Sequence, residues 1–496
     1  DVARGMLDHL APGTRGPLTS MAWLPDGFAA RQLAAVGDRG LDDALFDLRV
    51  ARSLGLVQVR PSGEQPPGET TWYRFPDPVR EALASTRSAD ETHDFVERYV
   101  GIMSAELLRV RPRFTGRFWA AAAEELSVHG TNVAAAVRSC PDPDRAVELG
   151  AAMVACWSAV GSSAPARQLL ASLDELDGVG DRGRALLPLM RGSIVGSFAQ
   201  RALYLSDLED GRRYAAACGD RDLELRLMSE VVIGRGWSGD VIVARQLLDE
   251  MHDEAKSAPD PWTWVQYCTF VALGDALAGR LQQGLDALIE LAERFGELGD
   301  GDSATSTLAM AGIFLRRMGE LDRAERILRR AVDQHAPTVL NRHGLANAIY
   351  ELALVAKARS QPDAIARLTH AVELLDRYGE HRTAAVAHRD LGAQLLAQGD
   401  LEVSVGHLQR SLPVLLRVDV QASAAALAML AAAASRCGQA QVAAQLVGAA
   451  NDRRARPGGL PLSADESALF EGWPTESLAI DDVRLLELVA TVGPRR

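Results

Sequence analysis

Apolar residues recur at helical spacing along most of the chain, each time after a turn residue. In one such stretch, Gly319 is followed by Ala324 and then by Ile327, Leu328 and Ala331. Residues three and four positions apart lie on one face of an α-helix, so this spacing predicts an amphipathic helix with one buried stripe. The pattern recurs elsewhere: Gly239 precedes Ala244, Leu247 and Leu248; Gly279 precedes Leu285 and Leu288; Gly399 precedes Leu408; and Gly438 precedes Ala443 and Leu446.

The recurrence has a constant step. The turn residues stand at positions 239, 279, 319, 359, 399 and 438, with steps of 40, 40, 40, 40 and 39 residues. Arg359 takes the turn position in one unit, before Ala364 and Leu368. Gly161 lies 78 residues before Gly239, so a further turn is expected near Gln200. Seven or eight helical hairpins are therefore predicted over about residues 142–450.

A repeat of this kind predicts a stacked array. Glycine ends a helix by adopting a left-handed conformation without steric cost, and alanine lets two helices approach closely. A single hairpin cannot bury its own apolar face, so neighbouring hairpins stack into a superhelix. The pattern resembles the tetratricopeptide repeat, although that repeat has a period of about 34 residues, which predicts longer helices or loops here. The expected fold class is all-α: a tetratricopeptide-like superhelix of helical hairpins. A plain bundle of helices is the alternative, which the constant step disfavours.

Residues 1–90 follow a different pattern. The run Leu41–Leu54 has helical spacing, Leu56–Arg60 is typical of a strand, and Thr71–Phe75 alternates as a returning strand would. Between the two strands, Pro61–Thr70 holds three prolines and two glycines and is expected to be a loop. This segment is therefore predicted to form a two-stranded hairpin after a helix.

A further helix is expected beyond the returning strand. Asp77 is predicted to cap it, with Pro78 at its first position. Helices around a two-stranded hairpin are typical of a winged helix, so a small winged-helix domain is predicted to precede the repeats.

The charge of this block argues against DNA binding. Residues 1–90 hold ten arginines and twelve acidic residues, and the whole chain has a net charge of -13. The helix before the hairpin carries Asp42, Asp43 and Asp47 against Arg49 and Arg52. A helix that reads a DNA groove is expected to be basic, so a structural spacer is favoured and no direct nucleic-acid binding is expected.

Five stretches carry a family resemblance, in order along the chain. They are Ala22–Phe28, Ser53–Val57, Tyr73–Glu81, Glu125–Val137 and Ala443–Ala450. These resemble, respectively, the stretches "LAVFPGGF", "KSLV", "YRLLETVRE", "EHDNLRAAL" and "AARLLGAAE" of LuxR/AfsR-type or MalT-like transcriptional regulators, which are signal-transduction ATPases with numerous domains (STAND ATPases). The resemblance implies a layout of nucleotide-binding ATPase, winged helix, helical spacer, repeat superhelix and effector. It also implies that the repeats sense an inducer or a partner.

Catalytic and cofactor motifs are missing from the sequence. There is no GxxxxGK[ST] phosphate loop, and neither Lys256 nor Lys357 follows a glycine. HExxH, GxSxG and GxGxxG after a strand are also missing, and Gly299–Asp302 lacks the rest of a calcium loop. We expect no catalytic residue, no metal site and no enzyme activity in this chain; ATP or ADP would bind an upstream domain.

The cysteines and the apolar runs bear on the compartment. The five cysteines are odd in number and lack CxxC spacing, which favours a reducing cytosol: Cys140, Cys156, Cys218, Cys268 and Cys437. The longest apolar stretch, Ala422–Ala434, is too short to span a bilayer. A cytoplasmic protein without a membrane segment is expected.

One predicted helix is unusually aromatic. It carries Trp262, Trp264, Tyr267 and Phe270, and Arg316 and Arg317 end the first helix of the next hairpin. Aromatic rings beside arginines can hold a peptide or an aromatic metabolite, so Trp262, Trp264, Tyr267, Arg316 and Arg317 are the candidate binding residues. Aromatic residues at helical spacing more often pack between hairpins, and this alternative is favoured.

The expected layout is a winged-helix domain at residues 1–90, a helical spacer at 91–141, repeats at 142–450 and a C-terminal helical tail at 451–496 with a helix near Ile480–Val492. The function expected is that of the sensor and transmission region of a bacterial STAND-type transcriptional regulator. Two alternatives stay open: a stand-alone scaffold for protein–protein interaction, and the regulatory half of a cyclase or kinase fusion. The chain begins at Asp1 rather than at methionine, and it is expected to lack the motor and the output of such a regulator. The sequence leaves the ligand and the oligomeric state open.

Overall fold

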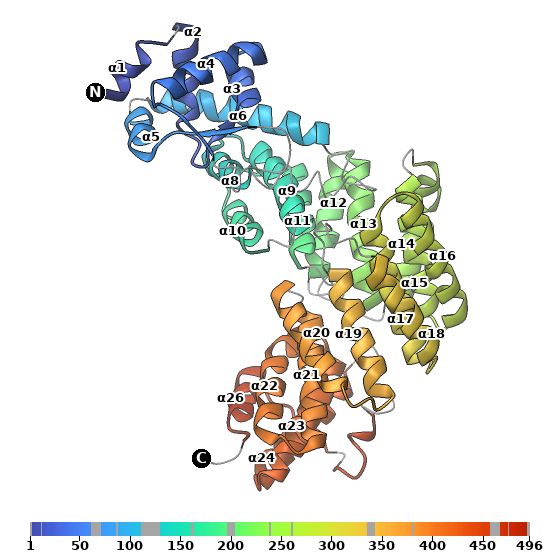
Figure 1. The fold of residues 1–496 in the computed structure, drawn as a ribbon. Helices are drawn as coiled ribbons and strands as arrows, with labels where there is room; N and C mark the ends of the chain where they lie inside the picture. The colour runs from blue at the N-terminus through green and yellow to red at the C-terminus, as the bar shows by residue number, and fades with distance from the viewer. Residues whose placement is uncertain are drawn as a thin grey trace. The chain divides into compact units, whose positions relative to one another are not determined.

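The computed structural model describes residues 2–10, 12–60, 71–85, 88–110, 129–159, 163–195, 204–237, 240–258, 261–334, 343–378, 381–456, 467–474 and 476–493. Most of them are helical, and the described strands form one small sheet near the N-terminus, as Figure 1 shows. The predicted fold class is confirmed. The expected loop Pro61–Thr70 and the expected turns at Gly161, Gln200 and Gly239 lie outside the described residues.

The chain divides into two compact units, which are residues 1–194 with 217–219, and residues 195–216 with 220–496. The helices of the first unit are α1 (Val2–Leu7), α2 (Pro12–Met21), α3 (Ala30–Val36), α4 (Leu41–Ser53), α5 (Asp77–Ala84), α6 (Ala89–Val110), α8 (Gly130–Ser139), α9 (Pro143–Ala159), α10 (Ser163–Asp174) and α11 (Asp181–Val195). Its strands are β1 (Phe28–Ala29), β2 (Gln58–Val59) and β3 (Trp72–Arg74).

The predicted hairpin is present and gains a third strand. β2 pairs antiparallel with β3, with Val59 opposite Tyr73. β1 pairs antiparallel with the other edge of β3, with Phe28 opposite Tyr73. The sheet order is therefore β1-β3-β2. A strand of two residues has too few positions to show alternation, which is why the sequence pattern missed β1.

The Pro-Asp-Gly loop before β1 is tied to the spacer. The buried Asn132 of α8 donates from Nδ2 to the carbonyl oxygen of Gly27 at 2.7 Å and accepts from the Asp26 N–H at 3.0 Å. Gly27 has φ +85°, and a Cβ there would stand 2.4 Å from the carbonyl oxygen of Tyr73, so this position requires glycine. Two of the stretches that carry the family resemblance are thus in direct contact.

The predicted cap of α5 is wrong. The helix begins at Asp77 itself, Pro76 is the N-cap residue, and no side chain caps the helix. Asp77 already lies within the first turn, where its carboxylate faces Arg80 at 4.0 Å instead of the backbone amides. The negative charge of Asp77 in the first turn still interacts favourably with the positive end of the helix dipole.

The second unit consists mainly of paired helices. They are α12 (Leu205–Ala217), α13 (Arg221–Trp237), α14 (Val241–Ser257), α15 (Pro261–Leu277), α16 (Leu281–Glu297), α17 (Gly301–Arg317), α18 (Leu321–Gln334), α19 (His343–Ala358), α20 (Ala364–Tyr378), α21 (His381–Gln398), α22 (Leu401–Val418), α23 (Val420–Arg436), α24 (Ala440–Arg454) and α26 (Asp482–Ala490). The first helices of neighbouring pairs contact one another, α13 with α15, α17 with α19 and α21 with α23, as stacked hairpins require.

The turns within the pairs share one backbone geometry. At Gly279, φ is +90°, the glycine N–H donates to the Ala276 carbonyl at 3.2 Å, and the Arg280 N–H donates to the Asp275 carbonyl at 2.9 Å. This pair of bonds is a Schellman motif, in which glycine adopts the left-handed conformation. Positive φ values of 79°, 91° and 74° occur at Gly319, Gly399 and Gly438. The prediction that these glycines end the first helix of each pair is confirmed.

One turn is displaced by a residue. The sequence predicts Arg359 as the turn residue, but the positive φ of 53° falls on Ser360, whose N–H donates to the Lys357 carbonyl at 2.8 Å. The Arg359 side chain instead pairs with Glu325 of α18 in the preceding hairpin. Any residue with a Cβ is strained in the left-handed region, and in this turn Ser360 is the residue that adopts it.

The C-terminal tail covers the last hairpins. Leu485 and Val489 of α26 are buried, and Gln409 of α22 donates from Nε2 to the Val489 carbonyl at 2.9 Å. Gly448 of α24 permits a close approach, because a Cβ there would stand 2.6 Å from the Cβ of Leu478. The predicted helix near Ile480–Val492 is present as α26, and it closes the exposed end of the stack, as terminal elements of repeat proteins must.

Candidate functional site

Two of the predicted binding residues stack on each other on α15 and pack against His252 of α14. The rings of Trp264 and Tyr267 stack with centroids 5.2 Å apart, and His252 of α14 lies edge-on to both. His252 Nδ1 is also 3.2 Å from the Tyr267 hydroxyl. Burial, and then the nearby Asp249 carboxylate, raise the pKa of that hydroxyl. These aromatic residues therefore join consecutive hairpins, which is the packing role that the sequence favoured.

Trp262 contacts a different interface. Its Nε1 donates to Asp300 at 2.6 Å, and its ring lies 6.1 Å from that of Phe295 in α16. Asp300 also accepts from the Ser303 N–H at 3.0 Å and so caps α17. A residue two positions from Trp264 on a helix faces the other way, so the structure does not bring Trp262 to the Trp264 cluster.

Arg316 contacts the next hairpin. Its Nε donates to the buried Glu351 of α19 at 2.6 Å. Burial alone would lower the pKa of Arg316, but the Glu351 carboxylate outweighs burial and raises that pKa. Arg317 ends α17 and is exposed. A ligand-binding role for the five residues stays a prediction, but they do not form one cluster.

An apolar cavity lies farther along the interface between α14 and α15, and the sequence interpretation missed it. Its volume is about 350 Å³, which falls within the range of about 300–1,000 Å³ typical of small-molecule sites. Its walls are mostly aliphatic and aromatic, with Val232 and Ile233 from α13, Val241, Ile242 and Leu248 from α14, and Phe270 and Leu273 from α15.

Small residues on α15 leave this space open. A Cβ added at Gly274 would find its nearest neighbour, Leu248 Cδ1, 4.0 Å away. At Gly312 of α17 the same Cβ would stand 2.3 Å from Leu328 Cδ2. Gly312 therefore makes helices approach closely, whereas Gly274 borders a void. Glycine at these two positions looks alike in sequence, and the neighbouring helix decides its effect.

Charged side chains lie at the edge of the cavity. Arg245 and Arg280 both line it, and both donate to one carboxylate oxygen of Asp275, Arg245 at 3.2 Å and Arg280 at 2.5 Å. The arginine side chains are about half exposed, at 50% and 51%, whereas that of Asp275 is 11% exposed. The cavity thus combines an apolar interior with two guanidinium groups that water can reach.

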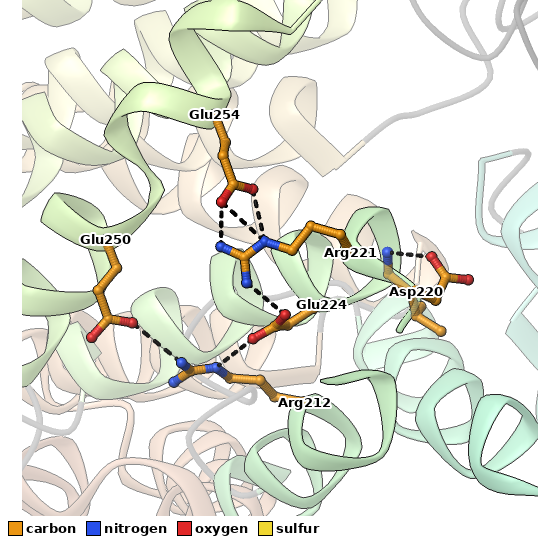
Figure 2. Close-up of polar contacts among 7 residues, drawn as sticks. Arg212, Asp220, Arg221, Glu224, Glu250 and Glu254 are labelled. Atoms are coloured by element: carbon orange, nitrogen blue, oxygen red, sulfur yellow. Dashed lines mark hydrogen bonds and ion pairs between the residues drawn. The ribbon is translucent and has the colours of Figure 1, made fainter. Parts of the chain in front are cut away.

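A network of ion pairs joins α12, α13 and α14, as Figure 2 shows. Arg221 of α13 donates to both carboxylate oxygens of Glu254 in α14 and also pairs with Glu224. Arg212 of α12 lies 3.6 Å from Glu224 and donates to Glu250 of α14 at 3.2 Å. Hydrogen bonds from Arg221 to Glu254 and then to Glu224 raise the pKa of Arg221. A bidentate pair within such a network holds helices together better than isolated exposed pairs do.

Within the described residues, no group of three or more His, Cys, Asp or Glu side chains could hold a metal ion. Among the helices of that same part of the chain, none combines the length and apolarity needed to cross a membrane.

Solved structures show what the fold is similar to. A signal transduction ATPase with numerous domains (STAND) protein with a tetratricopeptide repeat sensor, from Pyrococcus horikoshii, matches with a TM-score of 0.52 and 14% identity over 90% of this chain. The match spans 63% of that protein's chain. A chain of the APC/C hetero-tetramer Cut9-Hcn1 matches with a TM-score of 0.30 and 13% identity, covering 89% of this chain and 83% of that one. No family model matches the sequence, and no curated protein matches it significantly. The chain therefore has a tetratricopeptide-like helical repeat fold similar to that of a STAND protein with a repeat sensor.

Proposed function

We propose that this chain is the sensor and transmission region of a STAND-type transcriptional regulator, and that its repeats bind a small ligand or a protein partner. One observation carries the proposal: this chain, a small block with a short sheet followed by stacked hairpins, matches over 90% of its length a STAND protein with a tetratricopeptide repeat sensor. At 14% identity this likeness concerns the fold. The regulatory role rests on the fold together with the motifs described above.

Contacts between those motifs support the finer assignment to LuxR/AfsR-type regulators. Asn132, from one motif, holds the loop at Gly27, from another. Gly448, from the last motif, lets the C-terminal tail approach, and its carbonyl accepts from the Leu478 N–H at 2.9 Å.

We also propose that the chain is not itself an enzyme. The sequence has no phosphate loop, and the charged groups at the cavity edge pair with one another instead of activating a nucleophile. ATP hydrolysis would belong to another domain of the same protein. Purified chain incubated with ATP and Mg²⁺ is expected to release phosphate no faster than buffer, and a rate above buffer that persists after repurification would contradict this.

The decisive experiment for the regulatory proposal is genetic. The reading frame on both sides of the 496 residues is sequenced, and the promoters that respond to deletion of the gene are mapped. A phosphate loop before the chain, a DNA-binding domain after it and a defined set of affected promoters are expected. Flanking start and stop codons without any change in transcription would overturn the proposal.

A specific observation favours one alternative, a scaffold that binds another protein. Helix α4 exposes Leu41 by 50% and Phe46 by 61%, although large apolar side chains are usually buried. Asp47 of the same helix points inward and accepts from Thr14 at 2.7 Å. The outer face of α4 thus exposes two large apolar side chains beside charged residues of both signs, which suits a protein partner. If the chain is such a scaffold, the exposed face of α4 is the first surface to test for partner binding.

A further inference from the structure

We propose that the cavity between α13, α14 and α15 binds a small apolar carboxylic acid. The hydrocarbon part lies among the aliphatic walls, and the carboxylate pairs with Arg245 and Arg280. This inference deepens the proposed sensor function and rests on it for biological meaning, but the binding itself can be tested separately. Three observations carry it: the walls of the cavity, its mouth and its charged edge.

The walls and the mouth favour a hydrocarbon. The cavity of about 350 Å³ is lined by Leu248, Phe270 and Leu273, which offer no hydrogen bond from their side chains. At the mouth, Ile242 is 75% exposed, in a position where burial would be favourable. A ligand that covers Ile242 and fills the cavity removes this apolar surface from water.

The charged residues at the edge of the cavity favour an anionic ligand. Arg245 and Arg280 share Asp275, and a guanidinium group has five N–H donors. Arg245 also pairs with the exposed Asp249 at 3.2 Å, so Arg280, which pairs with Asp275, is the better ligand for an added carboxylate. Arginine recognises carboxylates through two parallel hydrogen bonds, which gives such a pair both strength and direction.

The repeat departs from its own pattern at this point. The residue after the turn glycine is acidic at Asp240, Glu320 and Asp400 and neutral at Gln439, whereas it is the basic Arg280 at the cavity. The residue five positions earlier has the opposite charge in each case: it is the basic Arg235 before Asp240 and the acidic Asp275 before Arg280. Arg235 pairs with Asp240 at 3.1 Å in one hairpin, and Asp275 pairs with Arg280 in the next. This exchange preserves the ion pair and turns its cationic member toward the cavity lining.

The test uses the 496-residue chain and three probes with the same hydrocarbon: octanoate, octan-1-ol and octylamine. Dissociation constants are measured by isothermal titration calorimetry at pH 7.5. Octanoate is expected to bind at least about tenfold more tightly than octan-1-ol, and octylamine more weakly than both, because the arginines attract an anion and repel a cation. Equal affinity for octanoate and octan-1-ol, or binding of none of the probes, would overturn the proposal.

Variants locate the site. R280Q is expected to weaken octanoate binding about tenfold and to leave octan-1-ol binding unchanged. Its matched control is R294Q, because Arg294 is exposed, pairs with Glu297 and lies about 20 Å farther along α16. G274L is expected to abolish binding of both probes by filling the cavity. If G274L does not fold, G274A, which adds a single carbon to the same wall, is expected to weaken both probes severalfold. Unchanged binding in R280Q, or in the folded cavity-filling variant, sinks the assignment.

The two proposals can fail independently. Octanoate binding that depends on Arg280, together with a gene whose deletion leaves transcription unchanged, would sustain the site and refute the regulatory function. A promoter response to the gene, together with no probe binding to the purified chain, would refute the acid site alone.

Discussion

Two interfaces of the repeat array follow the same repeat step, but their helices pack together to different extents. Helix α23 buries alanines and leucines on nearly all sides, including Ala424, Ala431 and Leu430, against α21, α22 and α24. The interface between α14 and α15 instead leaves a cavity. On α15 the large rings of Trp264 and Tyr267 stand at one end, and the small Gly274 stands at the other.

The difference shows what a repeat leaves undecided. At one end of α15 the rings of Trp264 and Tyr267 pack against His252 of α14, whereas at Gly274 an added Cβ would meet no atom closer than 4.0 Å. On α23 the small residues are distributed along the helix, so the neighbours approach evenly and pack to the density of a protein interior. Spacing in sequence determines which helices stack, and the distribution of side-chain volume determines whether a cavity remains.

The largest expected effect concerns the two buried carboxylates of these regions. In D390A of α21, the Tyr350 hydroxyl loses the buried carboxylate to which it donates at 2.6 Å, and the buried Arg389 loses its ion pair with Asp390. We expect a loss of about 3–5 kcal/mol in the free energy of unfolding by urea. D275A is expected to cost about 1 kcal/mol or less, because Arg245 and Arg280 can turn to water. Equal losses would show that Asp390 and Asp275 are equally shielded from water.

Truncation of leucines gives the next largest effect. L446A removes a fully buried side chain from α24, and about 2–5 kcal/mol is expected to be lost. L273A enlarges a cavity that solvent can already enter, so we expect a loss at the lower end of that range. Urea denaturation followed by circular dichroism compares them, and a larger loss for L273A would contradict the distinction between the two interfaces.

Alanine substitutions at two glycines of one hairpin are expected to change the free energy of unfolding in opposite directions. A Cβ at Gly284 would stand 2.5 Å from the carbonyl oxygen of Ala272, so G284A should force α15 and α16 apart at a cost of about 1–3 kcal/mol. At Gly274 there is room, so G274A should gain about 0.5–1 kcal/mol from the better helix propensity of alanine. Thermal unfolding of the two variants measures the sign, and a loss in G274A would show that the void is absent in solution.

The smallest expected effect is a pH dependence in the closed region. His407 Nδ1 lies 2.8 Å from His388 Nδ1, and Asp376 and Arg410 also act on it. Burial, and then His388 and Arg410, lower the pKa of His407 below its usual value of 6.5, against the opposing effect of Asp376. The unfolded chain therefore binds a proton first as the pH falls below 6.5, and the stabilising contribution decreases as the pH falls through the lower pKa of the folded state.

The measurement is the urea midpoint between about pH 7 and pH 5. H407Q is expected to flatten the decrease, because glutamine does not titrate. H370Q, at an exposed histidine of α20, is the matched control and should leave the slope unchanged. A slope that is the same in H407Q and the unaltered chain would show that His407 does not titrate differently on folding.

The repeats were predictable because their signal is local and recurs. Gly279 and Gly319 end helices through hydrogen bonds within their own turns, so the same residues specify the same geometry at each step. The displaced turn at Ser360 departs from this rule, because the turn there lacks a glycine and the ion pair of Arg359 comes from another hairpin. Sequence patterns therefore predict a turn best where the residues of the turn itself form the hydrogen bonds that stabilise it.

The candidate site was predictable only in part. The aromatic character of α15 drew attention to the right helix, but Trp262 turned out to face α17, and Arg316 is engaged with Glu351. The exchange of charges between Arg235–Asp240 and Asp275–Arg280 is visible in the sequence and could have indicated the cavity edge. A void has no residues of its own, so no pattern marks it directly.

By itself, the amino-acid sequence determined the helical class, the step of the repeat and the small sheet-containing block that precedes it. These features follow from backbone conformation and from apolar periodicity, which act within a few turns of chain. The tertiary structure decided which glycine presses against a neighbour and which one borders a cavity, and it decided which charge each arginine meets. Those outcomes depend on the distance between helices, which is set by the volumes of side chains far apart in sequence.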